Sequence, residues 1–349
     1  MSFGKGSKLA AGLDIGANSI KLVKLKKKGD GYILKALAIK ELPAGVITDE
    51  EIKDRDAVIF DIQSLVDQTD PKLKEVVLSI SGHGVITDKI VMDIKTGTEA
   101  EQAILFEAEQ RAPFDVEDVT MDYHIIQQDP ETNKMEVLLV AARNEFLKNY
   151  LDMIIDSGLK PVIVDTDAFA ILNAYKANYD IDPSRITALV DLGYDVTNIT
   201  FLKDGLYHST RDVSNGTRLI FDAVSKEFRL NKELTAKTLR GEMDSSIDHD
   251  MFKATVVTAS EELIAGLEVA ISYFKSSSNV EKVDWIVLSG GGALVPYVPE
   301  LLQSKLSIPI EICNPLRNIE YDPDMFIEFQ PEKIAPLLAV PIGLAVRSI

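Results

Sequence analysis

The sequence has a single cysteine, Cys313, among its 349 residues, so no disulfide can form within the chain. A single cysteine fits a reducing compartment. Basic residues are also in deficit, because 37 lysines and arginines stand against 55 aspartates and glutamates, for a formal net charge of −18. Nucleic acids and anionic membrane surfaces attract basic proteins. The composition therefore argues against both as partners.

Long hydrophobic runs are missing as well. The longest apolar stretch, residues 334–346, is too short and too rich in proline to cross a bilayer. The first eight residues are polar, and the apolar stretch after them is broken by Gly12, Asp14 and Gly16, unlike a signal peptide. We therefore expect a cytoplasmic protein without direct membrane insertion.

Several common catalytic signatures are absent from the sequence. It contains no G-x-x-x-x-G-K-[ST] phosphate loop, no G-x-G-x-x-G that opens a helix after a strand, and no nucleophile elbow. Its histidines are scattered without metal-ligand spacing: His83, His124, His208 and His249. Any chemistry must therefore come from a different pattern.

One short pattern occurs twice, 177 positions apart. Asp14 lies in Leu-Asp-Ile-Gly and Asp191 in Val-Asp-Leu-Gly; each phrase follows an apolar run and precedes an alternating, β-branched stretch. Each copy predicts a strand, a tight turn and a second strand. Such a turn presents peptide N–H groups to an anion, and its carboxylate can hold hydrated Mg²⁺. An ordinary hairpin turn is the simpler interpretation of either copy alone, whereas the pair favours a phosphate site.

Two further features could belong to the same site. Lys21 lies seven residues after Asp14, where it could reach a β- or γ-phosphate; the alternative is a solvated lysine on a basic hairpin. Gly290, Gly291 and Gly292 follow the apolar run 285–288, and three glycines let the backbone approach a ring or a phosphate closely. The alternative for this segment is a loose loop.

Apolar periodicity predicts the remaining elements. Helices are expected over residues 57–66, 98–112, 144–157, 168–177 and 334–347, with a helix-rich segment over 217–275. Strands are expected over residues 76–81, 85–94, 122–127, 136–142, 161–165, 285–289 and 310–313. Residues 82–158 thus form the series strand, helix, strand, strand, helix, which indicates a compact inserted module.

In order and spacing, these features resemble the actin-like ATPase superfamily. Phosphate loop one corresponds to residues 14–21, phosphate loop two to 191–197, and the adenosine loop to 290–292. Within the superfamily the chain is most similar to the PilM family of type IV pilus assembly proteins, with the FtsA cell-division family as the nearest relative. The similarity to PilM is carried by residues 12–23, 113–123, 140–143 and 339–347, and it extends over essentially all 349 residues.

The resemblance implies an α/β, actin-like ATPase fold. Two lobes with RNase H-like sheets would surround a nucleotide cleft, and an inserted α+β subdomain would extend the first lobe. The expected first-lobe core is residues 1–82, completed by a C-terminal helix at about 332–349. The inserted subdomain of FtsA/PilM type would be residues 83–158, and the second lobe residues 159–331, with phosphate loop two and the adenosine loop.

The resemblance also implies ATP and Mg²⁺ as ligands. Asp14 and Asp191 are expected to hold Mg²⁺ through water. The residues expected to bind the nucleotide are Asp14, Gly16, Asn18, Ser19, Lys21, Asp191, Gly193, Tyr194, Asp195, Thr197, Gly216, Lys237, Arg240, Gly290, Gly291 and Gly292.

The sequence departs from the family pattern at several of these places. Tyr194 and Asp195 stand where many relatives have glycines, and Tyr297 stands where a glycine is common. The ribose contacts, usually Glu and Lys, correspond here to Ala236 and Arg240. We therefore expect nucleotide binding with at most weak hydrolysis. Two aspartates are the candidates for orienting the attacking water: Asp165 and Asp167.

For function, the resemblance implies an ATP-binding scaffold of the inner-membrane platform that assembles type IV pili. Its partner would be the cytoplasmic N-terminal tail of PilN, bound in a groove on the first lobe to which Phe106, Pro113 and Phe114 could contribute; their alternative role is internal packing. Other platform and motor proteins, and a homo-oligomer, are further expected partners. The protein would reach the inner face of the inner membrane through a protein partner.

Two other functions are compatible with the same fold. One is an FtsA-like, membrane-tethered filament former; such chains end in a linker and an amphipathic helix, whereas this sequence stops two residues after Arg347. The other is a small-molecule kinase for a sugar or acetate, for which no catalytic base stands out in the sequence.

Overall fold

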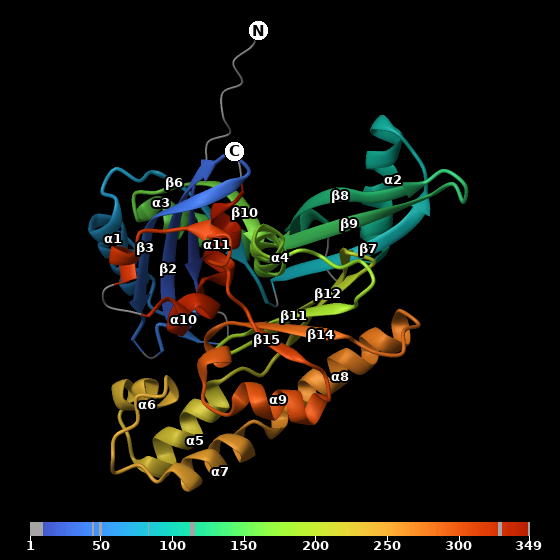
Figure 1. Ribbon diagram of the computed structural model, residues 1–349. Helices are drawn as coiled ribbons and strands as arrows, with labels where there is room; N and C mark the ends of the chain where they lie inside the picture. The colour runs from blue at the N-terminus through green and yellow to red at the C-terminus, as the bar shows by residue number, and fades with distance from the viewer. Residues whose placement is uncertain are drawn as a thin grey trace. The chain divides into compact units, whose positions relative to one another are not determined.

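The computed structural model describes residues 10–43, 45–48, 51–82, 84–111, 116–326 and 330–347. Contacts group the chain into two compact units, one formed by Met1–Ser79 with Ile154–Ile349 and the other by Ile80–Met153. Figure 1 shows both units along the chain, with the second unit carrying the labels β7, α2, β8 and β9.

The first sheet of the first unit is built around a meander. Strands β1 (Ala11–Ile15), β2 (Ser19–Lys28) and β3 (Gly31–Glu41) pair antiparallel, and β6 (Glu75–Ile80) pairs in parallel with β1. With β10 (Lys160–Thr166) and the short β16 (Ile319–Glu320), the strand order is β10-β6-β1-β2-β3-β16.

The second sheet repeats this arrangement. Strands β11 (Thr187–Leu192), β12 (Thr197–Lys203) and β13 (Leu206–Val213) form the meander, and β14 (Trp285–Ser289) and β15 (Ile310–Ile312) follow in parallel, in the order β13-β12-β11-β14-β15. The first sheet has the same series as β3-β2-β1-β6-β10. The duplicated sequence phrase therefore marks a duplicated sheet, in which β11 corresponds to β1.

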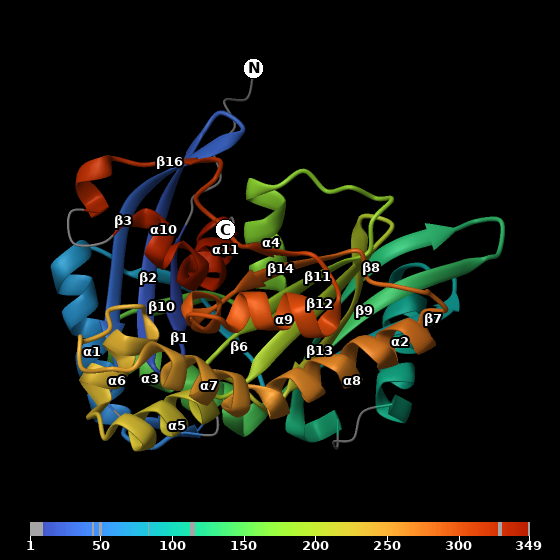
Figure 2. The same ribbon diagram turned by 60° about the horizontal axis from the view of Figure 1, so that its bottom comes forward.

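Two helices, α4 (Asp167–Asn178) and α11 (Ala339–Ala345), lie between the two sheets (Figures 1 and 2). One core cluster joins Val77 of the first sheet, Leu189 of the second, Ala170 of α4 and Leu344 of α11. Gly343 permits this close packing, because a Cβ there would lie 1.7 Å from the carbonyl oxygen of Ala170. The two sheets thus share a continuous core.

The outer faces of both sheets are covered by helices. In the first, α1 (Arg55–Thr69) packs against β2 and β3, and the short pair β4 (Ile47–Thr48) and β5 (Glu51–Ile52) precedes it. The helices that cover the far face of the second sheet (Figure 2) are α5 (Arg218–Phe228), α6 (Lys232–Leu239), α7 (His249–Ala259), α8 (Glu261–Ser277) and α9 (Val298–Leu306).

The second unit is a small α+β module. Its strands β7 (Val85–Asp93), β8 (Val119–Asp129) and β9 (Lys134–Arg143) form an antiparallel sheet in the order β7-β9-β8. Helix α2 (Gly97–Arg111) packs on it through Ile104 and Ala108, which meet Ile90 and Val137. Helix α3 (Asn144–Asp156) then leads back to the first unit. This is the series of elements that the apolar pattern predicts.

The C-terminal segment differs from the prediction of one helix over residues 334–347. It is divided into α10 (Pro331–Ile334), a 3₁₀ turn over Ala335–Leu338, and α11. Pro336 lacks the N–H that a continuous helix would use, while Pro341 lies in the first turn of α11, where no intrahelical N–H is needed. Among the described helices, none combines the length and the apolar character needed to cross a membrane.

Candidate functional site

The two Asp-x-Gly turns have the same geometry. In the first, the N–H of Gly16 donates to the carbonyl oxygen of Ser19 at 3.1 Å, and in the second the N–H of Gly193 donates to that of Val196, also at 3.1 Å. The strand registers match as well, since Asp14 pairs with Lys21 and Asp191 with Asn198. The two halves are therefore equivalent in backbone and differ in the residue that faces the aspartate, lysine in one and asparagine in the other.

The carboxylates of the two turns are close enough for their charges to interact. Lys21 Nζ lies 2.8 Å from Asp14 Oδ2, with the two side chains only 10% and 12% exposed. Asp191 Oδ1 accepts a 2.8 Å hydrogen bond from Ser289 Oγ. Burial raises the pKa of Asp191 to about 7, against the hydrogen bond from Ser289, and the charges of Asp167 and Asp14 raise it further. The fold thus gathers three aspartates and Lys21 around one place.

Two serines that the sequence analysis missed support this cluster. Ser289 is in register with Asp191 on the adjacent parallel strand, and Ser79 follows Leu78, which is in register with Leu13 just before Asp14. Ser79 Oγ donates to Asp167 Oδ1. A second repeated phrase could have identified both serines, because Val-Val-Leu-Ser lies in β6 and Ile-Val-Leu-Ser in β14.

The two candidates for orienting water have different surroundings. Asp167 is the first residue of α4, and its charge acts on Asp191. Asp165 is buried and lies 3.1 Å from Arg347 Nε, and burial raises its pKa despite that neighbour. Asp167 is therefore the candidate whose charge acts on Asp191.

The side chains of phosphate loop two are engaged within their own sheet and helices. The ring of Tyr194 meets Phe221 edge-on at 5.8 Å, and burial raises its pKa to about 12. The buried carboxylate of Asp195 lies 3.3 Å from Arg218 Nη1, and Thr197 Oγ1 donates to a backbone carbonyl at 2.7 Å. A ligand at this loop would therefore meet mainly backbone N–H groups.

The three glycines after β14 are packed rather than loose. Residues Gly291–Leu294 form a 3₁₀ helix. Gly290 has φ +82°, and a Cβ there would lie 2.5 Å from the carbonyl oxygen of Leu192, in phosphate loop two. Gly216, at the start of α5, is confined in the same way, since a Cβ there would lie 2.4 Å from the carbonyl oxygen of Tyr194. These glycines let the two predicted loops and the start of α5 approach one another.

The residues predicted to contact the ribose form ion pairs in this structure. Lys237 Nζ binds Glu233 Oε1 at 2.8 Å within α6. Arg240, which caps α6, pairs with Glu41 at the end of β3. Helix α6 of the second sheet therefore contacts the first sheet directly.

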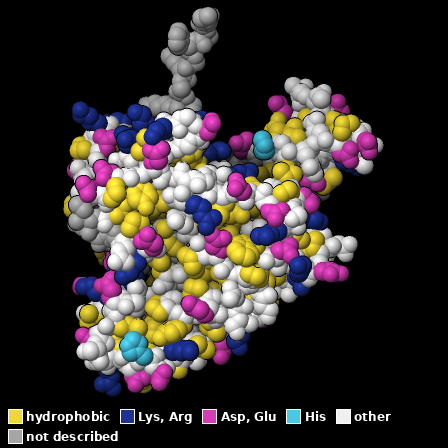
Figure 3. Space-filling view, in the orientation of Figure 1, with side chains coloured by type: hydrophobic (Ala, Val, Ile, Leu, Met, Phe, Trp, Pro, Cys, Tyr) yellow, Lys and Arg dark blue, Asp and Glu magenta, His cyan; other side chains and the backbone are white. Residues whose placement is uncertain are grey.

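The aspartates of the two turns are suited to a hydrated Mg²⁺ rather than to a metal held directly by several side chains. Within the described residues, no group of three or more His, Cys, Asp or Glu side chains is arranged to hold a metal ion. Mg²⁺ usually keeps several waters and uses one or two carboxylates, so Asp14 and Asp191 suit it without further ligands. Burial is the main cause of the raised pKa of Asp191, and the charges of Asp167 and Asp14 add to it, so a bound cation would favour the ionised form of this carboxyl group. Figure 3 has the orientation of Figure 1 and shows hydrophobic side chains on the surface in the region between α10 and α5. Ligand sites are usually lined by such side chains beside a few polar groups.

The residues predicted to bind a partner lie in or beyond α2. Phe106 is 59% exposed and its neighbour Leu105 is 44% exposed, so neither is an internal packing residue. Pro113 and Phe114 lie outside the described residues.

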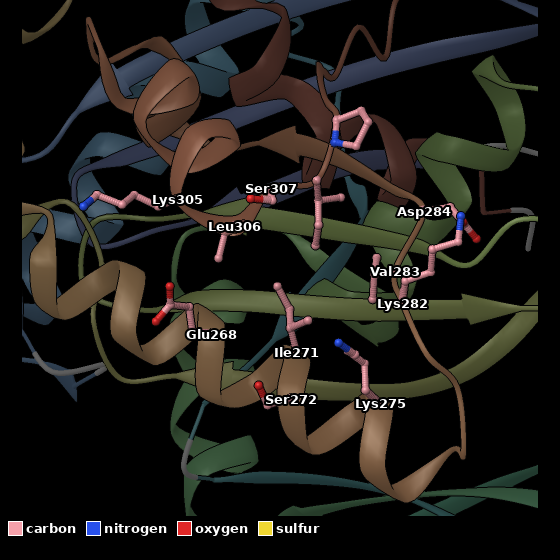
Figure 4. Close-up of a pocket in the computed structure, with 12 residues that line it drawn as sticks. Glu268, Ile271, Ser272, Lys275, Lys282, Val283, Asp284, Lys305, Leu306 and Ser307 are labelled. Carbon is pink, nitrogen blue, oxygen red and sulfur yellow. The ribbon is translucent and has the colours of Figure 1, made fainter.

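A separate hollow of about 580 Å³ lies among α8, α9 and the segment before β14. None of the predicted site residues lines it. Figure 4 shows Lys275 near Lys282 and Asp284 on one side, with Glu268 and Lys305 on the other. Charges of both signs therefore line this hollow, and it favours neither anions nor cations.

Comparison with known proteins places the chain among pilus proteins. The model of the family described as type IV pilus assembly protein PilM matches residues 12–349. A solved structure of a PilM–PilN type IV pilus biogenesis complex is similar at 26% identity and a TM-score of 0.85, with 98% of each chain covered.

Two more distant structures share the actin-like fold. The ethanolamine utilization protein EutJ of Carboxydothermus hydrogenoformans matches at 16% identity and a TM-score of 0.57, over 97% of this chain and 89% of its own. MreB5 of Spiroplasma citri, solved with ADP, matches at 11% identity and a TM-score of 0.52, over 96% and 94%. At such identities the likeness shows the fold alone, and it agrees with the two duplicated sheets.

Proposed function

The chain belongs to the PilM family of type IV pilus assembly proteins, and from that premise we propose that it is an ATP-binding scaffold of the inner-membrane platform that assembles type IV pili. The observation that carries the proposal is the match to the PilM–PilN complex over 98% of both chains at a TM-score of 0.85. An agreement of that extent includes the inserted unit as well as the duplicated sheets.

The proposed partner is the N-terminal cytoplasmic tail of PilN. The similar structure is described as a PilM–PilN complex, and this chain exposes an aromatic residue, Phe106, on the inserted unit. Large exposed aromatic side chains are typical anchors for a peptide. Binding to PilN would recruit the protein to the inner face of the inner membrane, beside the other platform and motor proteins.

The proposed ligand is ATP with Mg²⁺, held between two lobes. The first-lobe core would be residues 1–82 with the C-terminal segment from about 332, the inserted subdomain residues 83–158, and the second lobe residues 159–331. Asp14 and Asp191 would hold the hydrated ion, Lys21 would bind a phosphate, and the turns would donate peptide N–H groups. A bound nucleotide supplies negative charge that bridges the lobes and favours the closed arrangement. Asp167 would orient water in any slow hydrolysis.

The alternative functions have weaker support. The family match over residues 12–349 is to PilM, which favours neither an FtsA-like filament former nor a small-molecule kinase. Clear product formation with small acceptors would be the observation that restores the kinase hypothesis.

A binding assay tests the partner. A fluorescent peptide of the PilN N-terminal tail is titrated with the full chain, with and without Mg·ATP, and anisotropy reports the complex. We expect saturable binding in at least one of the two conditions. Absence of binding in both would refute the scaffold function.

The nucleotide site is tested by removing each aspartate. We expect Asp14→Ala and Asp191→Ala to weaken Mg·ATP binding at least tenfold, because hydrogen bonds to charged groups contribute about 1.5–3 kcal/mol. Isothermal titration calorimetry measures the affinity. Asp250→Ala, on the exposed side of α7, is the matched control, and affinity equal to wild type in both site variants would sink the assignment.

A further inference from the structure

Helix α6 of the second lobe reaches across to the end of strand β3 in the first lobe. Lys232 Nζ donates a 2.8 Å hydrogen bond to the carbonyl oxygen of Leu42. One residue earlier, Glu41 pairs with Arg240 at the other end of the same helix. Both ends of α6 are thereby fastened to two consecutive residues that lie about 190 positions away in sequence.

The contact continues to phosphate loop one. The N–H of Leu42 donates to the carbonyl oxygen of Asn18 at 3.0 Å, and Asn18 lies in the turn between Asp14 and Lys21. Two hydrogen bonds in series, both made by the backbone of Leu42, therefore link Lys232 of the second lobe to the loop that would hold the phosphates. Hydrogen bonds arranged in series polarise and strengthen one another.

The surroundings of Lys232 suit a bond that can open and close. Its side chain is partly buried, and burial lowers its pKa while the charge of Glu41 raises it. The acceptor on Leu42 is a neutral carbonyl, and the Glu41–Arg240 pair is largely exposed, at 55% and 42%. Exposed pairs contribute little stability individually, so the Glu41–Arg240 pair does not prevent the contact from opening.

We propose that Lys232, together with the Glu41–Arg240 pair, forms an interlobe clasp that positions phosphate loop one and controls how fast the nucleotide leaves. This inference rests on the proposed nucleotide function. Closing the clasp holds α6 over the end of β3 and fixes Asn18 through Leu42. A nucleotide between the lobes then dissociates only after the clasp has opened, so its residence time follows the closed population.

The first test of the clasp measures the distance between the two lobes in the absence of nucleotide. Spin labels are placed on Gln63→Cys in α1 and Glu227→Cys in α5, both exposed positions, and measured by double electron–electron resonance. Burial raises the pKa of the native Cys313 to about 12, so the introduced thiols react preferentially. We expect one narrow distance distribution in the wild type, and a broader distribution shifted to longer distances in Lys232→Met.

Rescue variants separate a positioning role from a general loss of structure. Lys232→Arg keeps a cationic donor and should restore the narrow distribution. Glu41→Arg should broaden it, and adding Arg240→Glu to that variant should narrow it again, because the swapped pair restores the attraction. Lys226→Met, an exposed lysine of α5, is the control and should match the wild type. A distribution in Lys232→Met that equals the wild type would overturn the clasp.

Stopped-flow release of a fluorescent ATP analogue then tests the control of exit. We expect dissociation about tenfold faster in Lys232→Met, since a hydrogen bond to a charged group is worth roughly that factor, with Lys232→Arg close to wild type. Longer distances between the lobes, combined with a wild-type rate of nucleotide release, would show that the clasp does not control release. Absence of nucleotide binding in the wild type would instead reject the proposed nucleotide function, and the distance measurement would still decide whether the clasp exists.

Discussion

Asp191 is a carboxyl group that the fold makes hard to ionise. Its pKa of about 7 lies well above the usual value of 3.8, so between these pH values the folded chain binds more protons than the unfolded chain at this site. The stabilisation from this group is therefore complete below about pH 4 and is lost as pH rises through about 7. Its slope is at most about 1.4 kcal/mol per pH unit.

We therefore expect Asp191→Asn, which stays neutral, to remove that contribution. Urea denaturation at a series of pH values from 4.5 to 8, without divalent cations, measures the free energy of unfolding. As pH rises across this range, the free energy of unfolding of the wild type should fall relative to that of Asp191→Asn. A constant difference would contradict the raised pKa.

Gly290 shows how a single backbone conformation joins two loops. We expect Gly290→Ala to destabilise the protein by about 3 kcal/mol or more, because a side chain at φ +82° and ψ 175° is strained by about 1–3 kcal/mol and the new Cβ would also lie 2.5 Å from the carbonyl oxygen of Leu192. Gly29→Ala is the matched control, since Gly29 also has a positive φ, +59°, but has open space around it. Urea midpoints compare the two, and equal losses would argue against the contact.

Site residues could be predicted from sequence where a local pattern marks them. Asp14 and Asp191 belong to a repeated phrase that is local in the chain, so pattern alone finds them. The partner of Arg240 is Glu41, 199 positions away, and no local pattern encodes a pairing that arises only when the sheets come together. The ion pair of Arg240, which stays a predicted ribose contact, could therefore not be foreseen from the sequence.

At the scale of elements, helix α2 is divided between a packed face and an exposed face. Ile104 and Ala108 are fully buried against the sheet of the second unit, while Phe106 is 59% exposed. We expect Phe106→Ala to weaken binding of the PilN tail peptide by about thirtyfold, because a buried aromatic anchor contributes about 2 kcal/mol or more. Its free energy of unfolding should change by no more than about 0.5 kcal/mol.

Fluorescence anisotropy with the PilN peptide measures the effect of Phe106→Ala. Phe60→Ala is the control, since Phe60 lies on α1 of the first unit and is 67% exposed. Equal peptide affinities for the two variants would move the docking surface away from α2.

Element order was more predictable than element ends. Alternating and helical periodicities are local, so they located the strands and helices of the inserted unit. The apolar pattern of the C-terminal segment is continuous and predicts one helix, yet a 3₁₀ turn that contains Pro336 separates α10 from α11. The close approach of Gly343 to α4 could not be predicted either, because packing between segments far apart in the chain leaves no periodic signal.

At the scale of the whole chain, one structural motif has been used twice around a shared core. The first unit contains both copies of the sheet, with α4 and α11 packed into the same cluster as Val77 and Leu189. The carboxylates of the two turns interact, and the clasp of α6 ties the copies together at a second place. A ligand between the copies would therefore act on the relative arrangement of both.

The proposed function predicts reciprocal coupling between the nucleotide and the peptide. If Mg·ATP changes peptide affinity by a given factor, the peptide must change ATP affinity by the same factor, because both describe one thermodynamic cycle. We expect a factor of about 5–150, the usual range for such coupling. Isothermal titration calorimetry measures the factor from four titrations: Mg·ATP with and without the peptide, and the peptide with and without Mg·ATP. At a peptide concentration that saturates the wild type but not the variant, Phe106→Ala should reduce the effect of the peptide on ATP while leaving the affinity for ATP alone unchanged. Peptide affinities that agree with and without Mg·ATP would show that the nucleotide does not control partner binding.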